Sequence, residues 1–240
     1  IRRDPLGDLA TDINQRADDV ESMLDAKRAP LLGISHDPRT PLSRMRLQLE
    51  FVDDDENAAS MKAEITEMEK IVAALLEAER LSGRHARLNR TRVHVGELVD
   101  ELIGDFFPRD RERIEVESPP QAIEADIDEA RVTLLLKNLV GNALRYSPAE
   151  AGPVVLAYRE DGDDLVFTVT DSGPGLSADQ VEHLGEPFYR SDPSRTRDSG
   201  GTGLGLYLAT LVAKAHRGSL AVIDQDEPGA SFEVRLPRMS

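Results

Sequence analysis

The feature that most constrains this chain is a change of hydrophobic period near residue 85. From about residue 6 to residue 80, apolar residues recur at helical spacing, interrupted by the acidic segment DDDEN at 53–57. Two helices joined by a short polar loop predict a helical hairpin, which cannot bury both apolar stripes alone, so we expect a homodimer with a four-helix bundle. The second helix carries a coiled-coil seam with alternating steps of four and three, at Met61, Ile65, Met68, Val72 and Leu75.

Beyond the segment LSGRHARLN (81–89), short β-type runs alternate with helical ones. The pattern predicts strands at 113–117, 153–160 and 164–171, helices at 96–107 and 129–147, and a closing hairpin with a Pro/Gly turn over 219–237. This order is typical of an α/β sandwich with helices packed on one face of a sheet. At 240 residues the chain is long enough for both units.

Charge and composition exclude several classes of function. The net charge of −16 repels phosphate backbones and anionic lipid, which argues against general nucleic-acid or membrane-surface binding and favours a basic partner. Without cysteine, neither a disulfide framework nor a thiolate metal site can form. No apolar run approaches the roughly 20 residues of a membrane span, and the absence of an initiator Met predicts a piece of a longer protein.

The segment LLGISHDPRTPLSRMRLQLEF (31–51) combines a histidine, an acid and two prolines. His36 directly precedes Asp37, and Pro38 and Pro41 follow inside a pattern that is otherwise an amphipathic helix. An interior proline costs a helix about 3 kcal/mol, so two prolines beside a histidine and an acid require a reason.

Three clusters in the second unit could bind a ligand, and the first two contain polar side chains. The segment NLVGNALRYSP puts Asn138 and Asn142 four apart on a helix, so that both amides point the same way, with Arg145 and Tyr146 just beyond. The segment DSGPG places Asp171 at the end of a predicted strand.

Glycines complete the second cluster and form the third. Gly173 and Gly175 allow the close backbone approach or positive φ that a ligand loop needs. In GGTGLGL, Gly201, Gly203 and Gly205 lead into a predicted helix, whose free N–H groups and positive dipole end suit phosphate.

Each cluster alone has a plainer interpretation as a helix cap, a turn or a linker. Together they describe an ATP site, with an acid to accept from an exocyclic amine, amides to hold hydrated Mg²⁺ and a loop to cradle phosphates. The site is not a Walker P-loop, because GxxxxGK[ST] is absent, and not a eukaryotic-type kinase, because HRD and DFG are absent.

The segments SHDPRTPL, NLVGNALRYSP, DSGPGL, PFYR and GGTGLGL stand in the order found in bacterial two-component sensor histidine kinases, which the chain closely resembles. The resemblance implies a HAMP-like linker end at 1–26, a HisKA-type dimerisation and phosphotransfer domain at 27–85, and a GHKL-type ATP-binding domain at 86–240. It also implies a transmembrane sensor upstream, so that this part is the cytoplasmic portion of an inner-membrane protein.

In this resemblance the catalytic residues are His36, Asp37 and Thr40. His36 is the expected phosphoacceptor, since a neutral imidazole is a usable nucleophile near pH 7. Asp37 is expected to bind the other ring nitrogen and help remove the proton, and Thr40 to orient water for dephosphorylating the partner.

The same resemblance implies a nucleotide site for ATP and Mg²⁺. Asp171 is expected to read the adenine and Asn142 to hold the metal. Tyr146 and Phe188 are expected to flank the nucleotide. Arg145 and the Thr202–Gly205 backbone are expected to meet the phosphates. The full set is Asn138, Asn142, Arg145, Tyr146, Asp171, Gly173, Gly175, Phe188, Arg190, Thr202, Gly203, Leu204 and Gly205.

Pro41 matches the proline of the family, whose kink is thought to let the helix bend, whereas Pro38 and Pro30 do not match. They are expected to make the turn around His36 less regular and easier to bend, either as a natural variation or as introduced changes. One functional hypothesis is therefore an autokinase that passes phosphate to an aspartate of a response regulator and also dephosphorylates that regulator. The other, motivated by Pro38, is a nucleotide-responsive dimerisation module with impaired kinase chemistry. A chaperone or topoisomerase relative is a distant third, because those lack SHDxRTP.

Overall fold

The computed structural model describes residues 56–82, 88–189, 203–223 and 229–238. The chain divides into two compact units, residues 1–75 and 76–240. Of the first unit the structure describes only residues 56–75, which form most of α3 (Glu56–Ser82). The predicted second helix is therefore present, while the first helix of the hairpin and the HAMP-like segment 1–26 lie outside the described residues. The predicted domain boundaries at 26/27 and 85/86 lie outside them too.

The second unit contains a five-stranded sheet in the order β2-β4-β5-β7-β6. β2 (Ile114–Glu117) pairs in parallel with β4 (Val154–Asp161), and the remaining pairs are antiparallel through β5 (Asp164–Thr170), β7 (Ser231–Pro237) and β6 (Ser219–Ile223). The predicted closing hairpin is confirmed, because β6 and β7 are paired from Ser219↔Arg235 to Ile223↔Ser231.

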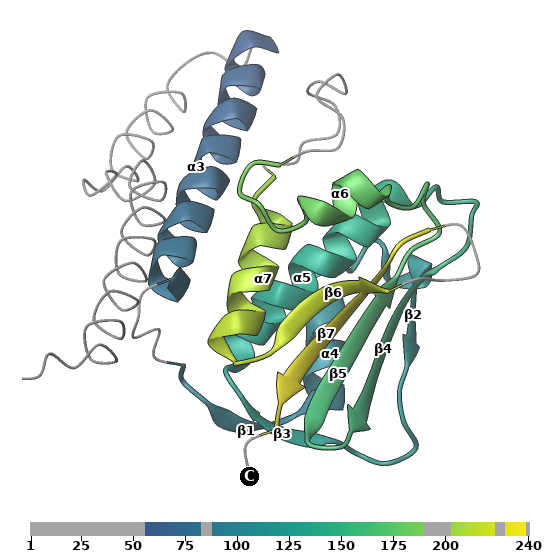
Figure 1. The fold of residues 1–240 in the computed structure, drawn as a ribbon. Coiled ribbons are helices and arrows are strands. Elements are labelled where there is room, and N and C mark those ends of the chain that lie inside the picture. The colour runs from purple at the N-terminus through teal and green to yellow at the C-terminus, as the bar shows by residue number, and fades with distance from the viewer. Residues whose placement is uncertain (1–55, 83–87, 190–202, 224–228, 239–240) are drawn as a thin grey trace, which may run out of the picture. The chain divides into compact units, whose positions relative to one another are not determined.

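The helices α4 (Val95–Phe106), α5 (Glu129–Tyr146) and α7 (Gly205–Ala215) cover one face of this sheet, as Figure 1 shows. Alternation along β5 explains the arrangement. Leu165, Phe167 and Val169 on one face are fully buried. On the other face Thr168 and Thr170 are only half-buried, although Val166 is buried there too. The prediction of helices on one face of a sheet is confirmed.

Two of the strands and one of the helices were not predicted from the sequence. β1 (Thr91–His94) pairs antiparallel with β3 (Glu124–Ile127) in a separate two-stranded sheet. In β1 only Val93 is buried, and in β3 the buried Ala125 and Ile127 alternate with acidic residues of low β-propensity, so neither segment has a clear strand signal. The short α6 (Ala178–Glu182) begins at a capping box of Ser177 and Gln180. A 3-10 turn, η1 (Arg111–Arg113), leads into β2.

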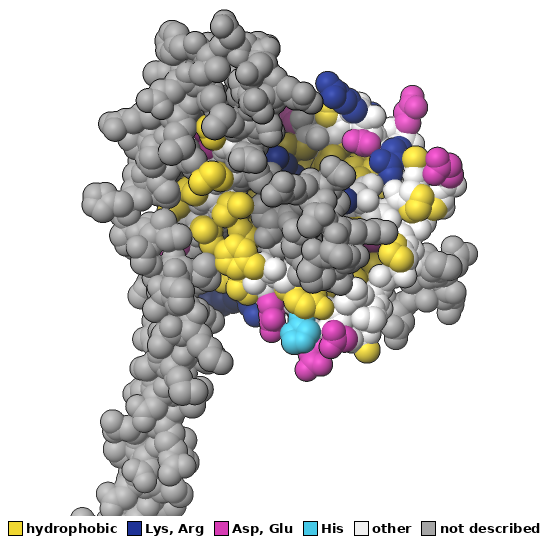
Figure 2. Space-filling view, turned by 90° about the horizontal axis from the view of Figure 1, so that it is seen from above, with side chains coloured by type: hydrophobic (Ala, Val, Ile, Leu, Met, Phe, Trp, Pro, Cys, Tyr) yellow, Lys and Arg dark blue, Asp and Glu magenta, His cyan; other side chains and the backbone are white. Residues whose placement is uncertain are grey.

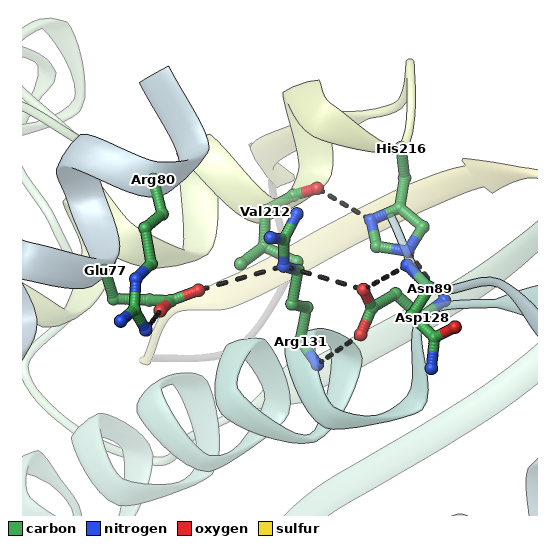
Figure 3. A network of polar contacts seen from close by, with 7 residues as sticks. All are labelled: Glu77, Arg80, Asn89, Asp128, Arg131, Val212 and His216. Atoms are coloured by element: carbon green, nitrogen blue, oxygen red, sulfur yellow. Dashed lines mark hydrogen bonds and ion pairs between the residues drawn. The ribbon is translucent and has the colours of Figure 1, made fainter. Parts of the chain in front are cut away.

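A buried polar cluster holds the N-terminal end of α5 (Figure 3). Asp128 caps the helix by accepting from the backbone N–H of Arg131 at 3.2 Å. Its backbone N–H donates to Nε2 of the fully buried His216 at 3.1 Å, and Nδ1 of His216 lies 2.9 Å from the carbonyl oxygen of Val212. Since a carbonyl only accepts, Nδ1 carries the proton and the imidazole is neutral. Asn89 N–H donates to the Asp128 carboxylate at 2.8 Å.

In the part of the chain that the structure describes, no helix is both long and apolar enough to cross a membrane.

Candidate functional site

Asp171, directly after β5, is buried and held by Ala230, the residue that precedes β7. Its Oδ1 accepts from the backbone N–H of Gly173 at 2.8 Å and of Ala230 at 3.2 Å, and its own N–H donates to the Ala230 carbonyl at 2.9 Å. Burial raises the pKa of the Asp171 carboxyl, and these two backbone hydrogen bonds oppose that rise. Because both bonds go to Oδ1, Oδ2 makes no hydrogen bond to the described residues and can serve a ligand.

The loop after Asp171 depends on its two glycines for different reasons. A Cβ on Gly173 would lie 2.9 Å from the carbonyl oxygen of Tyr146, so the loop packs directly on the last turn of α5. Gly175 has φ +76°, and a Cβ there would lie 2.9 Å from the carbonyl oxygen of Gly229. Both substitutions would require the backbone to shift.

The predicted amides lie on the C-terminal half of α5. Asn138 and Asn142 are half-buried, four residues apart, and therefore on the same side of the helix. Asn138 Nδ2 donates to the carbonyl oxygen of Leu134 at 2.9 Å. Arg145 and Tyr146 at the end of the helix are exposed. All four predicted residues of this segment thus follow one another along the end of one helix.

The glycine-rich segment reaches this helix at the start of α7. A Cβ on Gly205 would lie 2.9 Å from Oδ1 of Asn138, and Leu204 just before it is fully buried. Gly203 has φ +71°, and its carbonyl oxygen accepts from the N–H of Phe188 at 3.0 Å. The residues on either side of Leu204 therefore contact two different predicted site residues.

Two aromatic side chains of the predicted site are open to ligand. Tyr146 is 46% exposed and Phe188 is 49% exposed, although large apolar side chains are usually covered. Figure 2 shows hydrophobic side chains at the surface of the described part, with acidic and basic side chains between them.

The side-chain oxygens at this site can be compared with the ligands that Mg²⁺ takes in proteins. Among residues 56–82, 88–189, 203–223 and 229–238 there is no group of three His, Asp or Glu side chains that could hold a metal ion. Mg²⁺ commonly keeps water and substrate phosphate ligands and takes only one or two oxygens from the protein. The Asn142 side chain makes no hydrogen bond to another described residue, so its amide oxygen is available. These residues fit Mg²⁺ carried by a polyphosphate.

The structure brings the three predicted clusters together around the C-terminal half of α5. Gly173 approaches Tyr146, and Gly205 approaches Asn138. The contribution of Ala230 to Asp171 was not predicted, because PG at 228–229 gave only a turn signal and the contact crosses from β5 to β7. Five predicted site residues lie outside the described residues: His36, Asp37, Thr40, Arg190 and Thr202.

Comparison with known proteins gives consistent matches. Residues 127–240 match the family of histidine kinase-, DNA gyrase B- and HSP90-like ATPases. The chain is 34% identical over 242 residues to the signal transduction histidine-protein kinase BaeS of Escherichia coli (strain K12), covering 98% of this chain and 52% of BaeS. It is 30% identical to the sensor histidine kinase MtrB of Mycobacterium bovis, covering 96% of this chain and 42% of MtrB.

The fold also matches solved structures. The crystal structure of full-length ShkA in complex with AMPPNP aligns with a TM-score of 0.70 and 27% sequence identity, covering 87% of this chain and 45% of ShkA. The chain thus spans about half the length of BaeS, MtrB and ShkA.

Proposed function

The chain is a homologue of the sensor histidine kinases and carries their GHKL-type ATP-binding domain, and on that premise we propose that it is an ATP-dependent protein histidine kinase that phosphorylates His36. The observation that carries the proposal is the convergence of Asp171, the two α5 amides and the start of α7 around the end of one helix. A chaperone-like ATPase would also use this domain, but the relatives matched along almost the whole chain are histidine kinases.

The predicted site residues that the structure describes have separate roles in binding the nucleotide. Asp171 Oδ2 accepts from the exocyclic amine of adenine, while Oδ1 stays bonded to the backbone of Gly173 and Ala230. Asn142, with Asn138 beside it, binds Mg²⁺, which neutralises charge on the phosphates. The N–H groups at the start of α7 and the Arg145 guanidinium meet the phosphate oxygens.

The transfer step requires residues outside the described ranges. A ring nitrogen of His36 attacks the γ-phosphorus, the bond to the β-phosphate oxygen breaks, and ADP leaves. Asp37 accepts a hydrogen bond from the other ring nitrogen and so stabilises the charge that forms on the imidazole. The phosphoryl group then passes to an aspartate of a response regulator, and Thr40 orients water for its removal.

A homodimer is part of the proposal. In the seam of α3, Ile65 is buried, whereas Met68 is 51% exposed. An exposed methionine at a seam position favours a second copy of the chain, because a four-helix bundle needs two hairpins. Location on the cytoplasmic side of a membrane stays a prediction.

The proposal is tested by incubating the full chain with γ-labelled Mg·ATP. We expect label that is lost in acid and kept in base, as for a phosphoramidate, and lost altogether in His36→Gln. His183→Gln is the matched control, since His183 is also a histidine of this chain but is half-exposed beside Glu186, and should keep the label. ATP binding without label would favour the kinase-impaired dimerisation module instead, and label that persists in His36→Gln would contradict the assignment.

A further inference from the structure

Ser147, the residue that ends α5, joins this helix to the loop that carries Asp171. It is buried, with 5% of its surface exposed, and its backbone N–H continues the helix to the carbonyl oxygen of Ala143 at 2.9 Å. Its side-chain Oγ accepts from the backbone N–H of Ser172 at 3.1 Å. One hydroxyl therefore connects the last turn of α5 to the residue that follows Asp171.

Arg113, at the end of η1, holds Ser147 from the other side. Its Nη2 donates to the carbonyl oxygens of Leu144 at 3.2 Å and of Ser147 at 3.0 Å, and its Nη1 lies 3.2 Å from the Asp110 carboxylate. The last carbonyls of a helix have no partner within the helix and carry its negative dipole end, so a guanidinium is a favourable partner. The end of α5 is thus held in place by the guanidinium of η1, the turn that leads into β2.

The loop itself has little freedom against this helix end. A Cβ on Gly173 would lie only 2.9 Å from the carbonyl oxygen of Tyr146. On the other side of the loop, Ala230 both accepts from the Asp171 N–H and donates to its carboxylate. Ser147 therefore supplies the attachment on the α5 side and Ala230 the attachment on the β7 side.

We propose that Ser147 is a positioning residue for base recognition, whose hydroxyl sets the place of Asp171 relative to the amides of Asn138 and Asn142. This inference rests on the proposed function, in which Asp171 reads the adenine and the α5 amides serve the phosphate end. A bound nucleotide must contact Asp171 and the α5 amides at the same time. A change in the distance between them therefore weakens the contact of Asp171 with the base. Arg113 acts through Ser147 by holding the helix end against which Asp171 is positioned.

The test measures base selectivity rather than affinity alone. Mg·ATP and Mg·ITP are titrated by calorimetry into the full chain, because the hypoxanthine of ITP has an oxygen where adenine has the amine donor. Loss of one hydrogen bond to a charged group corresponds to about tenfold in affinity or more. In Ser147→Ala we expect ATP affinity to fall about tenfold, with ITP affinity changed less than about twofold, so that the preference for ATP collapses.

The matched control is Asp128→Ala, which removes the cap at the opposite end of the same helix. It should lower the melting temperature at least as much as Ser147→Ala, yet keep the ATP/ITP ratio of the wild type. If Ser147→Ala does not fold, Ser147→Cys keeps a similar volume with a much weaker acceptor and should also lose the preference.

The outcomes separate the two proposals. The inference is overturned if the wild-type chain prefers ATP and the Ser147 variants keep that preference in full. The proposed function then remains intact. A loss of preference in Asp128→Ala as large as in Ser147→Ala also overturns it, since general destabilisation would then be the cause. A wild-type chain that binds ATP and ITP equally contradicts the role of Asp171, and the inference falls with it.

Discussion

Gly205, the first residue of α7, lies directly against the side chain of Asn138 on α5. A Cβ on Gly205 would stand 2.9 Å from Asn138 Oδ1, and Asn138 cannot turn away freely because its Nδ2 donates to the carbonyl oxygen of Leu134. The absence of a side chain at Gly205 therefore lets the N-terminal end of α7 approach the amide-bearing side of α5.

Substitution of Gly205 by alanine tests this contact. In Gly205→Ala, Asn138 must shift or lose its bond to Leu134, and we expect a lower melting temperature and weaker ATP binding. Gly104→Ala on α4 is the control, because nothing lies within 4 Å of a Cβ there. It should raise the free energy of unfolding by up to about 1 kcal/mol through helix propensity. Equal melting temperatures for the two variants would contradict the close contact.

Asp171 gives ATP binding a distinctive pH dependence. Burial raises the pKa of its carboxyl in the folded chain, and only the ionised form is a full acceptor for the adenine amine. Affinity should therefore fall with decreasing pH as the pH passes through this raised pKa, above the range where an ordinary Asp titrates. Asp171→Asn should lower affinity about tenfold at neutral pH.

Asp171 affects the stability of the fold in the opposite direction to its effect on ATP affinity. A raised pKa means that the folded chain binds the proton more tightly than the unfolded chain, so the contribution of Asp171 to stability is present at low pH and is lost as pH rises through the folded pKa. Calorimetry for affinity and thermal melting for stability, each from pH 4 to 8, separate the two effects. An affinity profile with the same pH dependence in Asp171→Asn would rule out Asp171 as the group responsible.

His216 should make the ATP-binding domain sensitive to acid. Burial lowers the pKa of its imidazole below the ordinary 6.5; the Arg90 and Arg131 charges lower it further, while the Val212 carbonyl and the Asp128 carboxylate oppose this. Below pH 6.5 the unfolded chain therefore takes up the proton first. Stability is lost as pH falls from 6.5 towards the lowered folded pKa, by at most about 1.4 kcal/mol per pH unit.

The measurement compares melting temperatures of the wild type and His216→Gln between pH 5 and 8. Glutamine can accept from the Asp128 N–H and donate to the Val212 carbonyl, but it does not titrate. We expect a shallower dependence on pH in the variant. Identical slopes for the two proteins would show that His216 does not cause the acid sensitivity.

Asn142 is expected to act through the metal rather than through the fold. Its half-buried side chain makes no hydrogen bond within the described residues, so Asn142→Ala should leave the melting temperature nearly unchanged. Mg²⁺-dependent ATP binding and autophosphorylation should be lost. Titration of ATP in the presence of EDTA is the control, because metal-free binding should be the same in both proteins. Unchanged affinity for Mg·ATP in the variant would assign Asn142 a structural role.

Local chemistry was sufficient to predict much of this protein from sequence. The period-two runs became β4 and β5, the helical runs became α4 and α5, and the reason proposed for Gly175 was correct because a positive φ is a property of one residue. The clusters around Asn138 and Asp171 were identified because a ligand needs specific donors and acceptors close together in the chain.

Only the tertiary structure decided how these segments meet. The strand order β2-β4-β5-β7-β6, the pairing of the short β1 and β3, and the contacts of Ser147 with Ser172 and of Ala230 with Asp171 all join residues that are distant in sequence. A serine after a helix, or an alanine after a turn, has the same local pattern whether or not it reaches a site. Its role arises when burial of the helices and the sheet in one core brings backbone N–H groups and acceptors to within hydrogen-bond distance.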